Sequence, residues 1–189
     1  MLHSNRFIKI YIGALMCALF SSILCEPVFE ISDCGDDSSP IHFEKVQIFP
    51  LPVPVPGGVN INGTLHLNQQ ISGKINLEME VHRMSGLLPI YIPCIGDYGS
   101  CVYKDVCTMA PDTCPSGFDD AKIPCHCPMP MGDYNVPTFF KEINIRMLPA
   151  LYGDYKIVAK LIKVSENRRW FKEAQDVLGC ASFIVTIGK

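Results

Sequence analysis

The chain of 189 residues carries 16 basic and 19 acidic residues, and 48% of its residues are hydrophobic. Its first 25 residues hold two bases, Arg6 and Lys9, and no acid, around a long apolar stretch. This order predicts a secretory signal peptide over residues 1–25 and one mature domain over residues 26–189. Without those two bases, 14 basic residues stand against 19 acidic ones, a net charge of −5. We therefore expect no nucleic-acid partner, because nothing would neutralise its phosphates.

Strand patterns dominate the mature sequence. From Gly73 to His82, and again from Val59 to Leu67, apolar and polar residues alternate with the period of two that is typical of a strand with one buried face. Turn signals such as Gly153-Asp154 separate the short strands, which predicts an all-β sandwich, barrel or cup. The expected strands cover residues 41–49, 59–67, 73–82, 139–145, 155–164 and 180–187.

Two further segments have less regular patterns. Residues 49–55 contain prolines, which cannot donate to a central strand ladder, so we expect an extended edge or rim segment. Residues 165–178 begin with a helix-capping serine and place apolar residues roughly on one face. The same residues equally fit a long hairpin connection, and both interpretations stay open.

Eight cysteines follow the signal peptide. An even number behind a secretory signal predicts disulfides formed in an oxidising compartment. Cys34 and Cys180 lie near the ends of the mature chain, and the other six lie between residues 94 and 127. The Cys125-His126-Cys127 run also raises a zinc site, with Cys107 and Cys114 as further ligands, but the spacing fits zinc poorly. We expect disulfides, no metal and no cofactor.

The sequence has little that points to an enzyme. It lacks a nucleophile elbow, a zinc-protease motif and a phosphate-binding loop. Acid pairs such as Asp119-Asp120 could form a glycosidase dyad, but such clusters are usually solvated surface. We expect no catalytic residues. The sequon Asn62-Gly63-Thr64 predicts an N-linked glycan on Asn62.

Several predicted loops are unusually apolar. Apolar loop tips beside tyrosine or tryptophan are typical of a membrane interface or the mouth of a lipid cavity. An alternative is that these loops fold back over the core. The residues expected at a lipid cavity or a membrane are Leu87, Leu88, Ile90, Tyr91, Met129, Met131, Met147, Leu148, Leu151, Tyr152 and Trp170.

The cysteine-rich region and its surroundings contain a specific series of motifs. In chain order these are Ser85-Gly86-Leu87, Ile92-Pro93-Cys94, Asp97-Tyr98-Gly99-Ser100-Cys101, Ile123-Pro124-Cys125-His126-Cys127-Pro128, Gly132-Asp133-Tyr134, Leu148-Pro149, Gly153-Asp154-Tyr155 and Leu178-Gly179-Cys180. The series resembles the ganglioside activators, which are lysosomal lipid-presenting cofactors related to lipid-recognition domains of the MD-two type. The resemblance spans nearly the whole mature chain, from about Phe29 to Ile187.

The resemblance implies an antiparallel β-cup that encloses an apolar lipid cavity. It also implies the disulfides Cys34–Cys180, Cys94–Cys101, Cys107–Cys127 and Cys114–Cys125. The implied function is non-catalytic binding and transfer of a glycolipid, sphingolipid or phospholipid at a membrane surface, in a secreted or lysosomal protein. A lysosomal glycosidase would be the partner that such a protein activates.

The chain departs from the ganglioside activators at two places near the expected rim. Residues 166–176 are an insertion before the last strand, and Leu88-Pro89-Ile90 replaces a loop that contains tryptophan. These departures bear on the identity of the lipid and of the partner. The alternative function is a secreted interaction module of the innate-immune or chemosensory kind, which would bind a protein, a sterol or a fatty acid.

Overall fold

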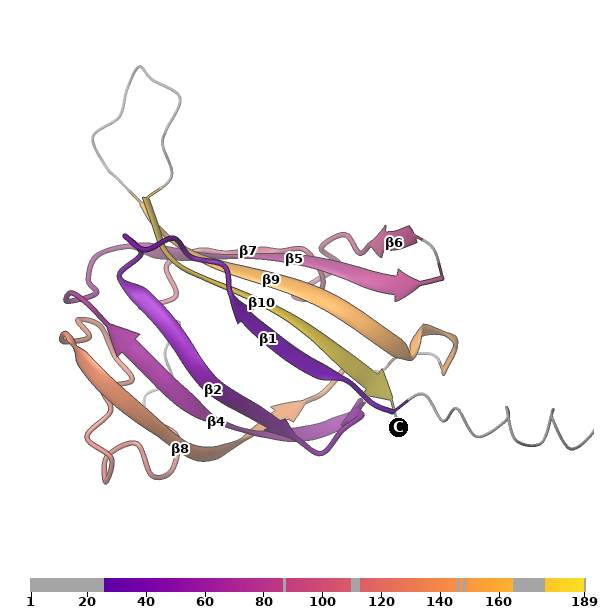
Figure 1. Cartoon of the computed structure of the whole chain (residues 1–189), viewed down its shortest axis with the longest axis horizontal. Coiled ribbons are helices and arrows are strands. Elements are labelled where there is room, and N and C mark those ends of the chain that lie inside the picture. Colours follow the sequence, from indigo (N-terminus) through magenta and orange to yellow (C-terminus); the bar gives the residue numbers. More distant parts are fainter. Residues whose placement is uncertain are drawn as a thin grey trace, which may run out of the picture.

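The computed structural model describes residues 26–86, 88–109, 113–145, 147, 149–164 and 176–188, and it shows two β-sheets (Figure 1). The larger sheet has the order β1 (Phe29–Asp33), β10 (Asp176–Gly188), β9 (Gly153–Lys163), β5 (Ile75–Ser85) and β6 (Leu88–Tyr91), with β3 (Val53–Pro54) beside β10 and β7 (Val102–Tyr103) beside β5. The smaller sheet has the order β2 (Ile41–Phe49), β4 (Gly57–Leu67) and β8 (Gly132–Ile143). All pairings except β3 with β10 are antiparallel. The all-β prediction is confirmed.

Helical structure is minimal in the part of the chain that the structure describes. Its one helix is the short 3-10 helix η1 (Pro149–Leu151). Within the described residues, no helix has the length and the apolar character that crossing a membrane requires.

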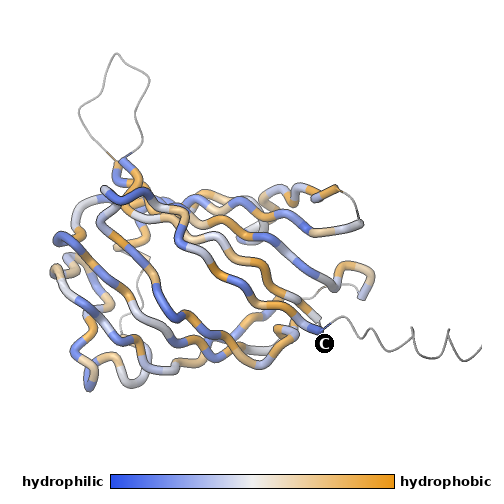
Figure 2. Tube along the Cα trace, in the orientation of Figure 1, coloured by the Kyte–Doolittle hydropathy of each residue, from blue (hydrophilic) through white to orange (hydrophobic). Residues whose placement is uncertain are grey.

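The alternating patterns identify the buried faces correctly. Ile75 and Val81 of β5 are buried, as are Val59 and Leu67 of β4, while the polar residues between them face solvent. Figure 2 shows the resulting alternation of hydrophilic and hydrophobic residues along the strands. Each apolar face turns toward the opposite sheet, so the interior lies between the two sheets.

The structure places the start of β8 earlier than expected. β8 begins at Gly132, seven residues before the expected start at residue 139. A β-bulge interrupts its pairing with β4, and Pro137 lies beside that bulge, so the alternation that would have marked the strand is broken. Residues 49–55 agree with the expected edge segment, because β3 covers only two of them.

The helix considered for residues 165–178 does not extend to its expected end. β10 begins at Asp176, which pairs with Lys163 of β9. The two strands are antiparallel neighbours, so residues 164–175 connect adjacent strands. Residues 165–175 lie outside the described residues.

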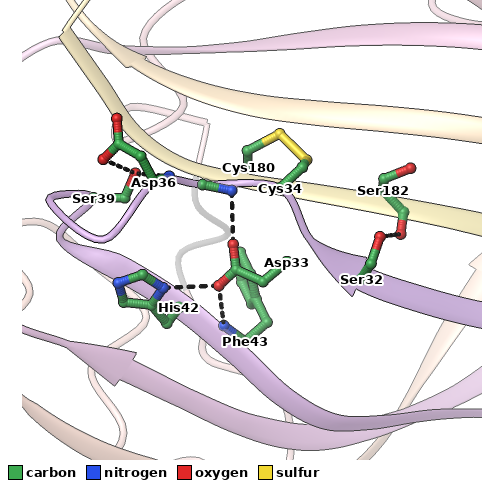
Figure 3. The surroundings of a disulfide bond; sticks show 10 residues. Ser32, Asp33, Cys34, Asp36, Ser39, His42, Phe43, Cys180 and Ser182 are labelled. Atoms are coloured by element: carbon green, nitrogen blue, oxygen red, sulfur yellow. Dashed lines mark hydrogen bonds and ion pairs between the residues drawn. A yellow bond between two sulfur atoms is a disulfide. The ribbon is translucent and has the colours of Figure 1, made fainter.

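The two sheets approach each other where β1 and β10 lie beside β2. Asp33, at the end of β1, has its Oδ2 atom 2.8 Å from His42 Nδ1 and accepts a hydrogen bond from the Phe43 backbone N–H, both on β2 (Figure 3). Cys34 follows directly and forms a disulfide with Cys180 of β10. At Gly179 an added Cβ would lie 2.8 Å from Ile41 Cβ, so glycine permits this close approach. Together these contacts close one edge of the molecule.

From that closed edge the sheets diverge toward β5 and β8 (Figure 1). The cysteine-rich segment between β7 and β8 is held by the disulfides Cys107–Cys127 and Cys114–Cys125. It packs onto the smaller sheet through an edge-to-face contact between Phe118 and Phe139, and its Ile123 is only 4% exposed. A fourth disulfide, Cys94–Cys101, closes the loop between β6 and β7. These are the four pairs that the resemblance implies.

The buried apolar residues form two clusters at opposite ends of the strands. One contains Ile41, Leu67, Ile71, Ile75 and Leu178. The other contains Val53, Val59, Val81, Tyr155 and Val185. Inward-facing residues in the middle of the strands, such as Phe43 and Phe183, are only partly buried. The packing is therefore tight at both ends of the interior and loose between them.

The disulfides should differ in what they contribute to stability. Cys34–Cys180 spans 146 residues of sequence and Cys94–Cys101 spans seven. In the loop-entropy estimate, replacing the first pair with serine lowers the free energy of unfolding by about 5 kcal/mol, and replacing the second by about 2.5 kcal/mol. Urea denaturation of the two double variants checks this order. Equal losses would show that chain entropy does not set the effect.

Candidate functional site

The space between the sheets contains a central chamber of about 560 Å³. Its walls come from five strands, β1, β2, β4, β8 and β10, and from the cysteine-rich segment. The apolar lining residues include Ile31, Phe43, Val46, Ile61, Leu65, Phe118, Ile123, Met129, Val136, Phe139, Ala181 and Phe183. No charged side chain lines this chamber among the described residues. Its size falls within the range of protein cavities that bind small organic ligands.

Two further chambers lie between the sheets. An end chamber of about 190 Å³ shares Phe43, Leu65 and Met129 with the central chamber. An edge chamber of about 590 Å³ lies between the β5 side of the larger sheet and the last residues of β8, and it shares Val106 with the end chamber. The central chamber thus shares wall residues with the end chamber, and the end chamber with the edge chamber, while the central and edge chambers share none.

The edge chamber is the part of the interior whose lining includes charged groups. Leu77 and Met79 of β5 and Ile143 of β8 give it an apolar floor. At its outer side lie exposed residues that include Tyr98 and Met109. Its charged lining residues are Asp97, Lys141 and Glu142. Its composition therefore changes from apolar inside to polar at the rim.

The structure brings two of the predicted apolar loops together. Arg83, near the end of β5, donates hydrogen bonds from Nη2 to the backbone oxygens of Ala150 and Tyr152, at 2.8 and 3.1 Å. The β5–β6 connection therefore lies beside η1. Exposed on this end of the molecule are Met84, Leu88, Ile90, Tyr91 and Leu151, which we call the apolar platform.

The other predicted residues lie elsewhere. Met129 lines both the central and the end chamber, near the opposite end of the strands. Met131 is exposed at that same end, close to the start of β8. Met147 packs on the second core cluster, and the Tyr152 hydroxyl donates to the Val55 backbone oxygen. Leu87, Leu148 and Trp170 lie outside the described residues.

Most of the chamber lining was not predicted as a site. Residues such as Ile61, Phe139 and Phe183 read in the sequence as ordinary inward-facing strand residues. Alternation identifies the face on which a side chain lies, but it does not tell whether the opposite sheet fills the space in front of it. Lys141, a charged residue that lines the edge chamber, was not predicted as a site residue either. Its place on β8 follows the same alternation as that of its apolar neighbours.

The remaining sequence candidates are His126, Asp119, Asp120 and Asn62, and of these Asn62 lines the central chamber. His126 is exposed beside Cys114 and Cys125, but those two sulfur atoms are joined in a disulfide and are not thiolate ligands. Asp119 and Asp120 are exposed in a turn of the cysteine-rich segment. Asn62 lies on β4, and its Nδ2 donates to Thr138 Oγ1 at 3.3 Å. The Asn62 glycan stays a prediction.

The outer face of the smaller sheet carries a row of paired charges. His42 and His66 lie opposite each other on β2 and β4. His42 pairs with Asp33, and His66 Nδ1 lies 2.6 Å from Asp133 Oδ1 and its Nε2 3.6 Å from Glu44 Oε2. The hydrogen bond with Asp133 raises the pKa of His66, with Coulomb attraction from both carboxylates adding to it.

This raised pKa predicts a pH dependence of stability. The folded state holds the His66 proton more tightly than the unfolded state, whose histidine pKa is about 6.5. The stabilisation is therefore complete below pH 6 and is lost as pH rises through the folded-state pKa. His66→Gln should reduce the loss of stability between about pH 6 and 8, within the roughly 1 kcal/mol of exposed ion pairs. Thermal unfolding across this range tests it, and an unchanged profile contradicts the assignment.

No family model matches the chain. Two curated relatives are the ganglioside GM2 activators of Mus musculus and Macaca fascicularis, each 26% identical over 159 residues. The match covers 80% of this chain and 82% and 84% of those proteins. The resemblance to the ganglioside activators is thus confirmed over four-fifths of the sequence.

Solved structures with some likeness include a Niemann-Pick type C2 protein from the Japanese carpenter ant and the C-terminal domain of Wzt. The first has a TM-score of 0.39 and 17% identity, covering 85% of this chain and 98% of the other. The second has a TM-score of 0.41 and 9% identity, covering 87% and 79%. At these scores neither carries an argument about this chain.

Proposed function

We propose that this protein binds a lipid inside its three chambers and transfers it between a membrane and an acceptor, without catalysing a reaction. The observation that carries the proposal is the apolar space between the sheets, about 560 Å³ in the central chamber alone. Each methylene of a hydrocarbon chain that leaves water for such a space contributes about 0.8 kcal/mol. The similarity to ganglioside GM2 activators over 80% of the chain supports the same function.

The apolar platform is the proposed contact with the bilayer. Leu88 is 76% exposed, and Ile90, Tyr91 and Leu151 are exposed beside it. Apolar side chains at such a tip can enter the boundary between headgroups and acyl chains. The Arg83 hydrogen bonds hold η1 beside the end of β5. Leu88 and Ile90 project from the same face of the sheet as Arg83, whereas Met84 and Tyr91 project from the other face. The lipid classes that we propose are glycosphingolipids, from the similarity to ganglioside GM2 activators, and phospholipids.

The cellular setting follows from the same reasoning. We propose that residues 1–25 are a signal peptide, that Asn62 carries a glycan, and that the protein is secreted or lysosomal. Four disulfides support an oxidising compartment. A lysosomal glycosidase that acts on the presented lipid is the proposed partner, again by analogy with the ganglioside GM2 activators.

Filling the central chamber should remove lipid binding. Ala181 lines this chamber, while its neighbour Ser182 lies on the opposite face of β10. The ring in Ala181→Phe would take the space of about five methylenes, which corresponds to more than a hundredfold loss of affinity for a long-chain lipid. The control Ser182→Phe should bind normally.

Native mass spectrometry of the purified, secreted proteins, followed by lipid extraction, measures the outcome. Wild type and Ser182→Phe should retain lipid, and Ala181→Phe should not. If wild type is recovered without lipid after incubation with vesicles, the proposed function is wrong. Equal retention by both variants would place the lipid outside the central chamber.

The platform can be tested separately by liposome flotation. Leu88→Ser removes an exposed apolar side chain from the platform, and Met131→Ser removes one of similar exposure, 68%, from the other end of the molecule. Leu88→Ser should lower membrane binding about tenfold, since burying a leucine contributes roughly 1.5–3 kcal/mol. Met131→Ser should leave it unchanged. A stable protein complex without membrane association would favour the secreted interaction module.

A further inference from the structure

One lysine faces the apolar interior from the edge of the smaller sheet. Lys141 of β8 lies directly opposite Val59 of β4, which is 5% exposed and belongs to the second core cluster. Residues directly opposite each other in an antiparallel pair project to the same face of the sheet. The Lys141 side chain therefore starts on the inner face and lines the edge chamber with Met79 and Ile143, and it is exposed to solvent.

Lys141 is also without a carboxylate partner. None of the described acidic residues forms a salt bridge with it, although Asp97 and Glu142 line the same chamber. It is the one basic side chain in the described lining of the three chambers. A cation beside apolar wall residues can bind the anionic group of a molecule that also carries a hydrocarbon chain.

Two acids and two tyrosines also line the edge chamber. Glu142 lies opposite Gly58, so its side chain starts on the outer face, and it is still one of the residues that line this chamber. Asp97 belongs to the loop closed by Cys94–Cys101, where the Tyr103 hydroxyl donates to the Asp97 backbone oxygen at 2.6 Å. Tyr98 of this loop is half-exposed. Carboxylates and an open tyrosine ring both attract a cationic amine.

We propose that the edge chamber is a headgroup site for a zwitterionic phospholipid. Lys141 would bind the phosphate next to the glycerol or ceramide part, and the amine would lie against Asp97, Glu142 and Tyr98. The acyl chains would extend inward past Leu77 and Met79. The inference rests on the proposed lipid-binding function and adds the class of headgroup to it.

The test is a competition among lipids that share their acyl chains. The full-length secreted protein is incubated with vesicles that contain equal amounts of phosphatidylcholine, phosphatidylglycerol, hexosylceramide and diacylglycerol, and the retained lipids are quantified by mass spectrometry. Wild type should enrich phosphatidylcholine about fivefold over the two lipids without phosphate, in line with roughly 1 kcal/mol for an exposed ion pair.

Three variants separate the contributions of the charges. Lys141→Met keeps the apolar stem and should lose the enrichment of both phospholipids, while Lys141→Arg should keep it. Asp97→Asn combined with Glu142→Gln should lose the preference for phosphatidylcholine over phosphatidylglycerol. Lys156→Met is the matched control, because Lys156 lies exposed on the outer face of β9 opposite His82. Circular dichroism confirms that every variant is folded.

The following results would contradict either the headgroup site or the lipid-binding function on which it rests. Unchanged selectivity in Lys141→Met overturns the headgroup site, and so does a wild-type preference for hexosylceramide. Enrichment of phosphatidylglycerol over phosphatidylcholine in wild type overturns the assignment of the amine. Retention of all four lipids without discrimination contradicts this inference but leaves lipid binding intact, whereas retention of none contradicts the proposed function itself.

Discussion

Apolar side chains from the two sheets pack against one another at both ends of the strands and leave space between those ends, and the other features depend on this arrangement. Two packed sheets normally lie about 10 Å apart, with their inner side chains interdigitated. Here the sheets meet along β1, β10 and β2, while the segment from Cys107 to Cys127 lies between the diverging edges. The wedge shape therefore keeps Phe43 of one sheet and Phe183 of the other from closing the interior.

Such an interior loses contacts that a filled core would make, because the atoms that line a void have no partners on one side. Disulfide bonds offset part of this loss, because they lower the entropy of the unfolded chain. Cys34–Cys180 joins the first strand to the last at the closed edge of the molecule. The Asp33 contacts with β2 join the two sheets at the same place (Figure 3). Cys107–Cys127 and Cys114–Cys125 fix a segment that contributes Phe118 and Ile123 to the chamber wall but has little regular structure.

The inner faces of β4 and β5 could be predicted from the sequence, because alternation with a period of two depends only on local geometry. The start of β8 could not, since a bulge and Pro137 interrupt the pattern there. The exposed apolar residues Leu88 and Leu151 were recognised, but Leu88 was expected in a loop and lies in β6. Their proximity depends on Arg83, which contacts Ala150 across 67 residues of sequence. The chambers depend on the distance between two sheets, and no local pattern encodes that distance. Lys141 was missed because its role depends on that same tertiary geometry.

The most direct test is a crystal structure of the secreted protein purified from cells without added lipid. The account predicts elongated, hydrocarbon-like electron density along the central chamber, in contact with Phe43, Phe139 and Phe183. A structure in which the two sheets have moved together and these rings fill the interior would contradict it.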